Sequence, residues 1–383
     1  MRIDQVSVHH ISLPFSFDFS HSLRRRSSAN NIIVEVSADQ GAIKGYGEGA
    51  PRSYVTGESQ GSATKNIGDL LQRDSFPWEF NEVGQIWDFL DSLPDGKEQN
   101  SATCALELAL LDALGKREER AIIQYFPTDF FTPSICYGTV VPLASKKTLT
   151  ELCELIRKME INKLRLKMGK DLEQNRQTTR TIQLIFGDNC DLRADVNGVW
   201  DYELAVAHVP LIKEHKVNVV EQPMSPDDPD IARYASVMRD CGVTLMADES
   251  ACSFGDMERI VEEGHYGMVN VRLSKCGGFR NSLKVIDYLR RHGISFQIGC
   301  QLGESGLLSA AGRTLSLLCS DAVYHDGSYD EFLLRENVTL EHVSFGHGGE
   351  AGPLAGPGLG VEINRENLER LGVPSTRVTV MRP

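Results

Sequence analysis

The sequence has no pair of cysteines in a CxxC pattern, and its nine cysteines are scattered along the chain. An odd number without such pairs indicates neither a disulfide framework nor a zinc site, and we expect most of these thiols to be small buried residues in a reducing compartment. No apolar run reaches the roughly 18–20 residues that span a bilayer, and the N-terminus lacks the apolar core of a signal peptide. These absences predict a cytoplasmic protein without a membrane partner.

The chain also lacks an excess of positive charge. Lys and Arg number 40 against 53 Asp and Glu, a formal net charge of -13. This excludes nucleic acid and anionic membranes as general partners. The composition itself, 41% hydrophobic and 24% charged, is ordinary for a globular protein. At roughly 100–200 residues per domain, the 383 residues predict two domains or one large domain with an elaboration.

Short β-rich runs alternate with amphipathic stretches of helical length through the middle of the chain. The runs begin at Ser134, Asn162, Cys190, Val217, Val243, Tyr266, Ile294 and Asp321. Polar residues that end five of the runs lie 26 to 28 residues apart, namely Lys167, Asp195, Glu221, Asp248 and Lys275. Eight strands alternating with helices at this pitch predict an α/β fold, a parallel βα barrel. An open doubly wound sheet is the alternative, disfavoured because the polar residues come from successive strand ends around a ring.

The segments on either side of the barrel have a different pattern. Residues 1–130 contain runs typical of antiparallel strands, one pair turned at Asp39-Gln40-Gly41, and then helical stretches. Residues 331–383 are rich in Gly and Pro, which favours loops and a short strand. We therefore expect an N-terminal α+β domain at 1–130, a catalytic barrel at 131–330 and a C-terminal segment at 331–383.

Three carboxylates follow consecutive strands of the predicted barrel. Asp195, Glu221 and Asp248 come at the ends of strands 3, 4 and 5, and the C-terminal ends of barrel strands build the active site. Uncompensated carboxylates at one mouth of the barrel repel one another, and a divalent cation bound between them would neutralise this repulsion. An all-oxygen set with open positions suits Mg²⁺, with Mn²⁺ as a substitute. Asn197 and Glu249 are expected just outside these metal ligands.

Cationic residues flank the predicted metal site. Arg165 and Lys167 are two apart on strand 2 and therefore share the face that points into the barrel. Strand 6 is expected to end at Lys275, and strands 2 and 6 are four apart in a ring of eight, so Lys167 and Lys275 should face each other across the mouth. Two lysines opposed across a metal are interpreted as acid–base catalysts rather than as solvated charges.

This arrangement predicts a reaction. A small-molecule carboxylate bound to Mg²⁺ has its α-proton acidified, because the metal stabilises the enediolate that forms on deprotonation. A lysine can act as the base only if its pKa is lowered, and Arg165 and the metal are placed to do so. The second lysine can return a proton from the opposite face or support the intermediate electrostatically.

The motifs LRLKMG around Lys167, DVN, EQP, ADES and LSKCGG around Lys275 resemble the enolase superfamily, in the muconate-lactonizing branch of its mandelate racemase/muconate-lactonizing enzyme family. The resemblance covers nearly the whole chain. It implies a modified (β/α)7β TIM-type barrel closed by an α+β capping domain, to which the C-terminal segment returns. The family usually has Lys-x-Lys on strand 2, whereas this chain has Arg165 in place of the first Lys. Arginine cannot deprotonate, so the resemblance carries over only an electrostatic or substrate-carboxylate role.

Within that branch the chain most resembles the dipeptide epimerases. The resemblance implies substrate contacts for Arg24, which would bind a side-chain carboxylate, and for Thr139, while a solvated basic turn at Arg24 is the alternative. Cys300, after strand 7, lines the mouth. Those enzymes carry Asp-x-Asp on strand 8 to hold the peptide ammonium, but this chain has Ser328-Tyr329-Asp330, so only Asp330 matches. An N-acylated or amine-free acid is therefore also a candidate substrate.

The predicted function is a Mg-dependent racemase or epimerase of a dipeptide or an N-acyl amino acid. The alternatives are a muconate-type cycloisomerase or an o-succinylbenzoate synthase. A paralogue that binds a metal and an acid without turnover is the non-enzyme alternative, disfavoured because binding alone does not require opposed proton donors. The sequence leaves open whether the protein forms a homo-oligomer.

Overall fold

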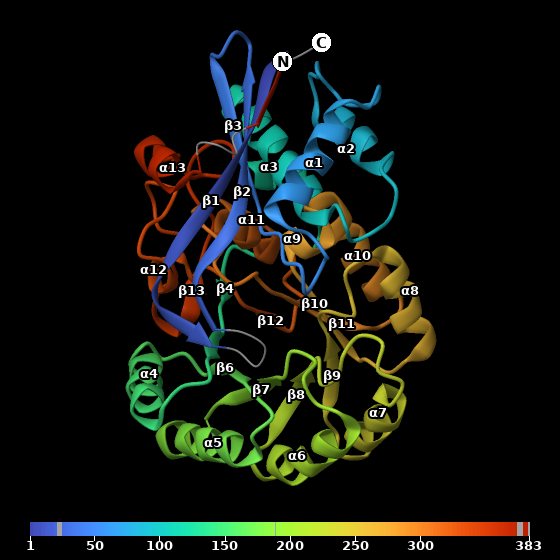
Figure 1. Ribbon diagram of the computed structural model, residues 1–383, viewed down its shortest axis with the longest axis vertical. Coiled ribbons are helices and arrows are strands. Elements are labelled where there is room, and N and C mark those ends of the chain that lie inside the picture. Colours follow the sequence, from blue (N-terminus) through green and yellow to red (C-terminus); the bar gives the residue numbers. More distant parts are fainter. Residues whose placement is uncertain (21–24, 188, 374–377, 382–383) are drawn as a thin grey trace.

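The computed structural model describes residues 1–20, 25–187, 189–373 and 378–381. An antiparallel sheet with helices stands over a parallel barrel (Figure 1). The sheet has the strand order β14-β1-β2-β3 among the described residues. No helix in the described ranges is both long enough and apolar enough to cross a bilayer.

The antiparallel sheet is built mainly from the first 49 residues. Its strands are β1 (Ile3–Ser20), β2 (Arg25–Ala38), β3 (Ile43–Gly49) and β14 (Val378–Met381). The predicted turn between β2 and β3 is confirmed, because Asp39 and Gln40 have φ values of 52° and 60°, the left-handed region that tight hairpins use. The helices beside the sheet are α1 (Gln60–Leu71), α2 (Val83–Asp91), α3 (Asn100–Arg117) and η1 (Ile122–Tyr125).

Glycines let helix α3 lie directly on strand β3. Gly45, Gly47 and Gly49 share one face of β3 because side chains alternate along a strand. A Cβ on any of them would lie within 2.2 Å of a backbone oxygen of α3. Only glycine permits this approach, and α3 is buried from Asn100 to Gly115 as a result.

The barrel is a parallel sheet of eight strands in the order β12-β11-β10-β9-β8-β7-β6-β5, counted over the described residues. The strands are β5 (Thr139–Val141), β6 (Lys163–Lys167), β7 (Asp191–Asp195), β8 (Val217–Glu221), β9 (Thr244–Ala247), β10 (Met268–Val271), β11 (Ser295–Ile298) and β12 (Tyr324–His325). Helices between them are α4 (Lys146–Lys158), α5 (Leu172–Phe186), α6 (Tyr202–Glu214), α7 (Ile231–Asp240), α8 (Phe254–Glu263), α9 (Leu273–Cys276), α10 (Phe279–Arg291) and α11 (Gly306–Leu317). The predicted barrel with a capping α+β part is confirmed.

Short elements lie just before the first barrel strand and after the last one. They are β4 (Ile135–Cys136), α12 (Asp330–Leu333), η2 (His347–Gly349), β13 (Glu350–Ala351) and α13 (Arg365–Leu371). β14 then pairs with β1, so the C-terminal segment completes the antiparallel sheet. The boundaries expected at residues 130 and 330 stay predictions.

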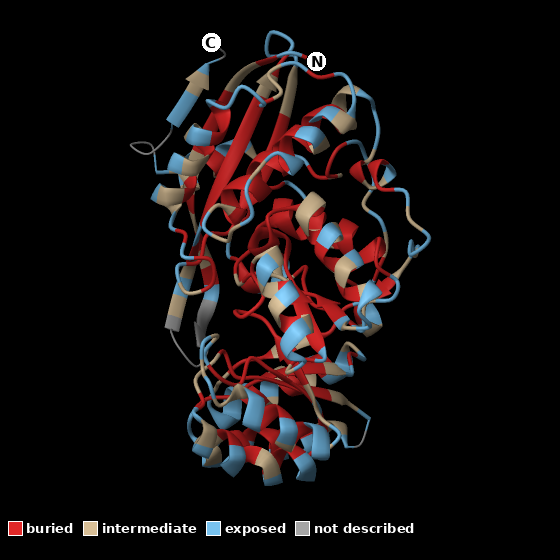
Figure 2. Ribbon diagram, turned by 90° about the vertical axis from the view of Figure 1, so that its right-hand side faces the viewer, coloured by how far each residue is buried: buried red, intermediate tan, exposed pale blue. Residues whose placement is uncertain are grey.

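Buried carboxylates of the capping part hold the N-terminal ends of barrel helices. Glu48 accepts hydrogen bonds from the backbone of Ser305 and Leu308, at the start of α11. Glu107 accepts from the backbone N–H groups of Phe279 and Arg280, at the start of α10. Helix N-termini carry unpaired N–H groups and a partial positive charge. These bonds fix the cap on the barrel, and Figure 2 shows buried residues filling both parts and the region between them.

Candidate active site

The ends of neighbouring strands bring four predicted residues into one row. Lys167, Asp195 and Glu221 are the last residues of β6, β7 and β8 and pair directly across the sheet. Asp248 follows β9 without a gap. The three carboxylates are fully buried and Lys167 is 8% exposed, so the row lies inside the mouth of the barrel.

Lys167 contacts the first carboxylate of the row. Its Nζ lies 2.5 Å from Oδ2 of Asp195 and 2.9 Å from Oδ1 of Asn197. Asn197 in turn donates to Glu249 over 3.2 Å. Burial and the nearby Asp248 and Asp195 carboxylates raise the pKa of Glu249 to about 8. The two residues expected just outside the ligands therefore form one hydrogen-bonded chain with Lys167.

Lys275 contacts the last carboxylate of the row. The sequence predicted it at the end of strand 6, which is wrong, because β10 ends at Val271 and Lys275 lies on the short helix α9. Its Nζ donates to Oδ1 of Asp248 over 2.9 Å and to the carbonyl oxygens of Asp248 and Asn270. Burial lowers the pKa of Lys275, but the Asp248 carboxylate together with the Cys276 and Cys252 thiols raises it overall. The two lysines thus bind opposite ends of the carboxylate row.

Two arginines lie between the carboxylates. Arg165 places Nη1 3.1 Å from Glu221 and 3.5 Å from Asp195. Arg272 contacts Glu221 over 3.3 Å and forms a shorter ion pair with Asp248. The sequence analysis did not identify Arg272. It lies two residues after the buried Asn270, and side chains two residues apart along an extended segment point to the same face, so this spacing could have identified Arg272 as inward-facing.

These cations determine the electrostatics of the row. Burial raises the pKa of Glu221, but Arg165, Arg272 and Lys167 outweigh it and bring the value to about 2. Burial and the Glu221 carboxylate raise the pKa of Asp195, even though Lys167 and Arg165 oppose them. The pKa values of these two neighbouring carboxyl groups are therefore shifted in opposite directions, because the cations outweigh burial at Glu221 but not at Asp195.

The donor atoms of the row and their present partners test whether the row fits a divalent cation. As the side chains lie, no three Asp, Glu, His or Cys residues in the described ranges are close enough to hold a metal together. Each adjacent pair of carboxylates instead shares one guanidinium group, from Arg165 or from Arg272. The donor atoms of the row are all buried carboxylate oxygens that already bind cationic groups. Oxygen donors of this kind are the ligands that Mg²⁺ prefers. The donor set therefore fits Mg²⁺, and Arg272 would compete with the ion for Glu221 and Asp248.

Arg165 also contacts a carboxylate outside the row, which it shares with a second arginine. Asp326 pairs with Arg165 Nε over 3.2 Å and binds Arg193 through both oxygens at 2.9 and 3.1 Å. Asp326 directly follows β12, and it is a shared partner of the two arginines. Arg193 is two residues before Asp195 on β7, so strand alternation could have identified it as inward-facing.

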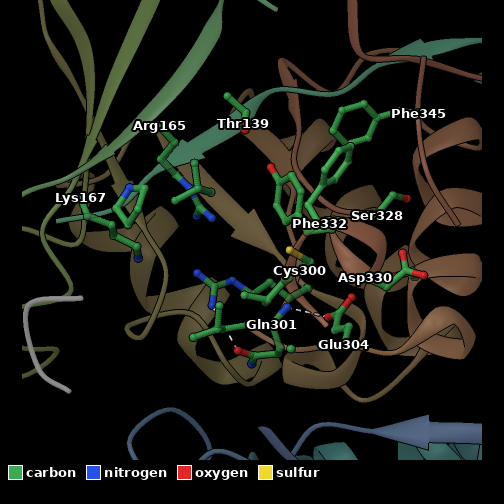
Figure 3. A pocket seen from close by; sticks show the side chains of 18 of the residues that line it. Thr139, Arg165, Lys167, Cys300, Gln301, Glu304, Ser328, Asp330, Phe332 and Phe345 are labelled. Atoms are coloured by element: carbon green, nitrogen blue, oxygen red, sulfur yellow. Dashed lines mark hydrogen bonds between the residues drawn. The ribbon is translucent and has the colours of Figure 1, made fainter. Parts of the chain in front are cut away.

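A cavity of about 250 Å³ opens above the row. Lys167 and Arg165 lie on one side of it, Phe332 and Phe345 lie on the other, and Thr139 and Cys300 lie between them (Figure 3). The structure thus brings Thr139, Cys300 and Asp330 to the cavity, while Lys275 lies behind Asp248 and outside its lining. Arg24 lies outside the described residues.

The comparison with known proteins agrees with this geometry. The sequence pattern described as "Enolase C-terminal domain-like" matches residues 148–367, more than half of the chain. A hydrophobic dipeptide epimerase of Enterococcus faecalis is 25% identical over 378 residues, 97% of this chain and 98% of that protein. An N-succinyl-L-Arg/Lys racemase of Bacillus cereus is 25% identical over 375 residues, 97% and 98% of the two chains.

Solved structures show the same fold over nearly the whole length. The N-succinyl Arg/Lys racemase from Bacillus cereus superposes with a TM-score of 0.86 at 24% identity, covering 99% of this chain and 100% of that one. A dipeptide epimerase from Cytophaga hutchinsonii, complexed with Mg and the dipeptide D-Ala-L-Val, superposes with a TM-score of 0.83 at 22% identity, covering 99% and 100%. With the family pattern, the barrel and the strand-end residues in agreement, the chain belongs to the enolase superfamily, in the family described as enolase C-terminal domain-like.

Proposed function

We propose that this protein is an isomerase that removes the proton α to a carboxylate and returns it to the opposite face, a racemase or epimerase of a dipeptide or an N-acyl amino acid. The observation that carries the proposal is the placement of Lys167 and Lys275 at opposite ends of one buried carboxylate row. Among the curated relatives that match nearly the full chain, a dipeptide epimerase and an N-succinyl amino acid racemase support the isomerase class, whereas an o-succinylbenzoate synthase is similar over the same length.

Asp195, Glu221 and Asp248 would hold Mg²⁺, which Mn²⁺ could replace, and the bound ion supplies positive charge that stabilises an enediolate. Arg165 adds a fixed positive charge beside the row, because its contacts with Glu221 and Asp326 hold it there. In this proposal one of the two lysines, as a neutral amine, takes the proton from the substrate α-carbon, and the other, as an ammonium group, returns a proton on the opposite face, with Lys167 on one face and Lys275 on the other.

A second candidate has one observation in its favour. Lys167 lines the cavity whereas Lys275 does not. A muconate-type cycloisomerase or an o-succinylbenzoate synthase needs only one lysine for proton transfer, and in such an enzyme Lys275 would act as a charge. Whether copies of the chain assemble into an oligomer stays a prediction that either function permits.

The test is incubation with Mg²⁺ in D₂O of pooled dipeptides and N-acyl amino acids of known stereochemistry, followed by mass spectrometry and chiral chromatography. An isomerase incorporates one deuterium at the α-carbon and inverts that centre in the same substrate. Exchange without inversion in the pool would favour a one-base reaction. Binding of these acids without any exchange would contradict the isomerase proposal and would favour a paralogue that binds a metal and an acid without turnover.

A further inference from the structure

Lys275 lies on a helix that is too short to be stable by itself. Helix α9 consists of four residues and ends at Gly277, whose φ of 87° is left-handed. A single turn gives few internal hydrogen bonds in return for the backbone order that it requires. The position of α9, and with it that of the Lys275 amine, must therefore be set by contacts with other parts of the chain.

The capping part makes hydrogen bonds to α9. Asn100, the first residue of α3, is 5% exposed. Its Nδ2 atom donates to the carbonyl oxygen of Lys275 over 2.6 Å and to that of Cys252 over 2.7 Å, so both of its N–H bonds are used. Cys252 lies in the loop that follows Asp248. One side chain of the capping part therefore joins the helix of the second lysine to the loop after the third carboxylate.

A second hydrogen bond and a glycine bring the capping part onto the same helix. The backbone N–H of Ala50 donates to Oγ of Ser274 on α9 over 2.8 Å. Directly after α9, a Cβ on Gly278 would lie 1.7 Å from Oε2 of Glu107 on α3. Only glycine permits this approach. The second glycine of the LSKCGG motif is thus required by the contact between α3 and the end of α9.

Packing alone does not fix the position of α9, because a cavity of about 110 Å³ borders it. Asn100 lines this cavity together with Cys252 and with Cys276, the last residue of α9. Close packing is what normally holds a buried element in one place. Side chains do not fill the volume here, so the hydrogen bonds of Asn100 have to hold the helix.

Lys167, in contrast, is held by the barrel itself. It ends β6, which pairs with β5 and β7 on its two sides. Its Nζ contacts Asp195 and Asn197, on and just after β7. Gly169, two residues later, donates to and accepts from the side chain of Asn175 on α5. All of these partners belong to the barrel, whereas the backbone of the other lysine is bound by the capping part.

We infer that Asn100 is a positioning residue of the proposed isomerase, which holds Lys275, and not Lys167, in place for proton transfer through the backbone of α9. The inference rests on the proposed function, because it assigns one face of the substrate to each lysine. A shift of about 1 Å in a reacting group can lower a rate by about 100-fold. The capping part therefore controls one of the two proton transfers in addition to covering the barrel.

The experiment has to separate the two lysines, because inversion of the α-carbon uses both of them in either direction. In Lys167→Met the remaining proton carrier is Lys275, and in Lys275→Met it is Lys167. Asn100→Ala is introduced into each of these two proteins. Exchange of the substrate α-proton with D₂O is then followed by mass spectrometry with the stereoisomer that each protein accepts, and kcat and KM are determined separately.

The two backgrounds should respond differently. In Lys167→Met, the Asn100→Ala substitution should lower kcat roughly 10- to 100-fold and leave KM within about twofold, since it displaces a proton carrier and no substrate contact. In Lys275→Met, the same substitution should change neither constant by more than about twofold.

A second variant and a control accompany this comparison. Asn100→Asp keeps the shape of the side chain but loses both N–H donors, so it should show the same difference. Asn66→Ala is the matched control, because Asn66 of α1 also donates to a backbone carbonyl, that of Glu98, over 2.8 Å. Amide hydrogen exchange without substrate should become faster in residues 272–278 of both Asn100 variants and stay unchanged in the control.

An equal loss of kcat in the two backgrounds would show that Asn100 only stabilises the fold, and it would overturn the inference. An unchanged kcat in the Lys167→Met background would overturn it as well, and either result leaves the isomerase proposal intact. Absence of α-proton exchange with every compound in the wild-type protein would instead contradict the isomerase proposal. Amide exchange would then still decide whether Asn100 holds α9, because a faster exchange of residues 272–278 supports this role and an unchanged one overturns it.

Discussion

Nε of Arg165 lies 3.2 Å from Oδ2 of Asp326, which anchors the arginine of strand β6 on a carboxylate outside the catalytic row. The other end of the same guanidinium group reaches Glu221 and Asp195. Burial lowers the pKa of Arg165, but these three carboxylates outweigh it and hold the value well above the usual range. Arg165 therefore acts as a permanent charge.

This assignment predicts different outcomes for two replacements of Arg165. Arg165→Lys keeps a cation in the row and should retain substantial activity. Arg165→Met removes one cation from the buried carboxylates, which should destabilise the fold by about 3–5 kcal/mol. Separately, kcat/KM should fall by roughly 100-fold or more, as expected when a group that stabilises developing negative charge is removed. The pH–rate profile should also shift, because a positive charge near Lys167 disappears. Arg280→Met is the control, since Arg280 pairs with Asp91 on the surface, and an unshifted profile in Arg165→Met would contradict the assignment.

The carboxylate row should be needed for metal binding and for turnover alike. Asp195→Asn, Glu221→Gln and Asp248→Asn each remove one charged ligand, and affinity for Mn²⁺, measured by electron paramagnetic resonance, should fall by more than about 100-fold, because loss of an outer hydrogen-bond partner alone costs about 10–100-fold. Circular dichroism should show an unchanged fold. Asp91→Asn, a change in an exposed ion pair, should have no effect. Full activity in thorough chelator would rule out the metal assignment.

The two lysines should show opposite stereochemical preferences. In an isomerase, Lys275→Met should still exchange the α-proton of one stereoisomer with D₂O through Lys167 without inverting it, and Lys167→Met should do so only with the other stereoisomer. Lys163→Met is the matched control, because Lys163 begins the same strand and its Nζ lies 5.9 Å from the centre of the Tyr324 ring. Loss of exchange in both variants for both stereoisomers would instead favour the cycloisomerase or synthase.

The carboxyl group that joins α3 to α10 should make stability depend on pH. Burial raises the pKa of Glu107 to about 8, although the backbone N–H groups of Phe279 and Arg280 oppose this. The folded protein then holds a proton that the unfolded chain releases near its ordinary value of 4.5. By linkage, this group destabilises the fold as the pH rises from about 4.5 toward 8.

Glu107→Gln should therefore flatten the decrease of Tm between pH 6 and pH 8, measured by circular dichroism. One of the two accepted backbone bonds is lost, so a decrease in stability of about 1–2 kcal/mol at pH 6 is expected. Glu336→Gln, a change in an exposed ion pair with Arg370, should leave the pH dependence as in the wild type. A parallel pH dependence in Glu107→Gln would show that the carboxyl group is ionised throughout.

The sequence alone was sufficient for the barrel and for most of the catalytic row. Strand and helix periods repeat locally, and residues that end successive parallel strands must meet at one mouth. Lys167, Asp195, Glu221 and Asp248 could be placed in this way. The turn at Asp39 and Gln40 was also predicted, because a turn depends on a few adjacent residues, and the structure adds their left-handed φ values.

The partners of those side chains were decided by the tertiary structure. Arg272 contacts Glu221 from 51 residues away, and Arg193 contacts Asp326 from 133 residues away. Such pairs depend on the register of strands and on the packing of the barrel interior, which no local pattern specifies. The short helix that carries Lys275 and the hydrogen bond from Arg313 to Ser328 have the same origin. The sequence by itself determined which residues reach the mouth of the barrel, and only the folded chain decided what each of them touches, because burial forces every charge there to find a partner brought from elsewhere in the chain.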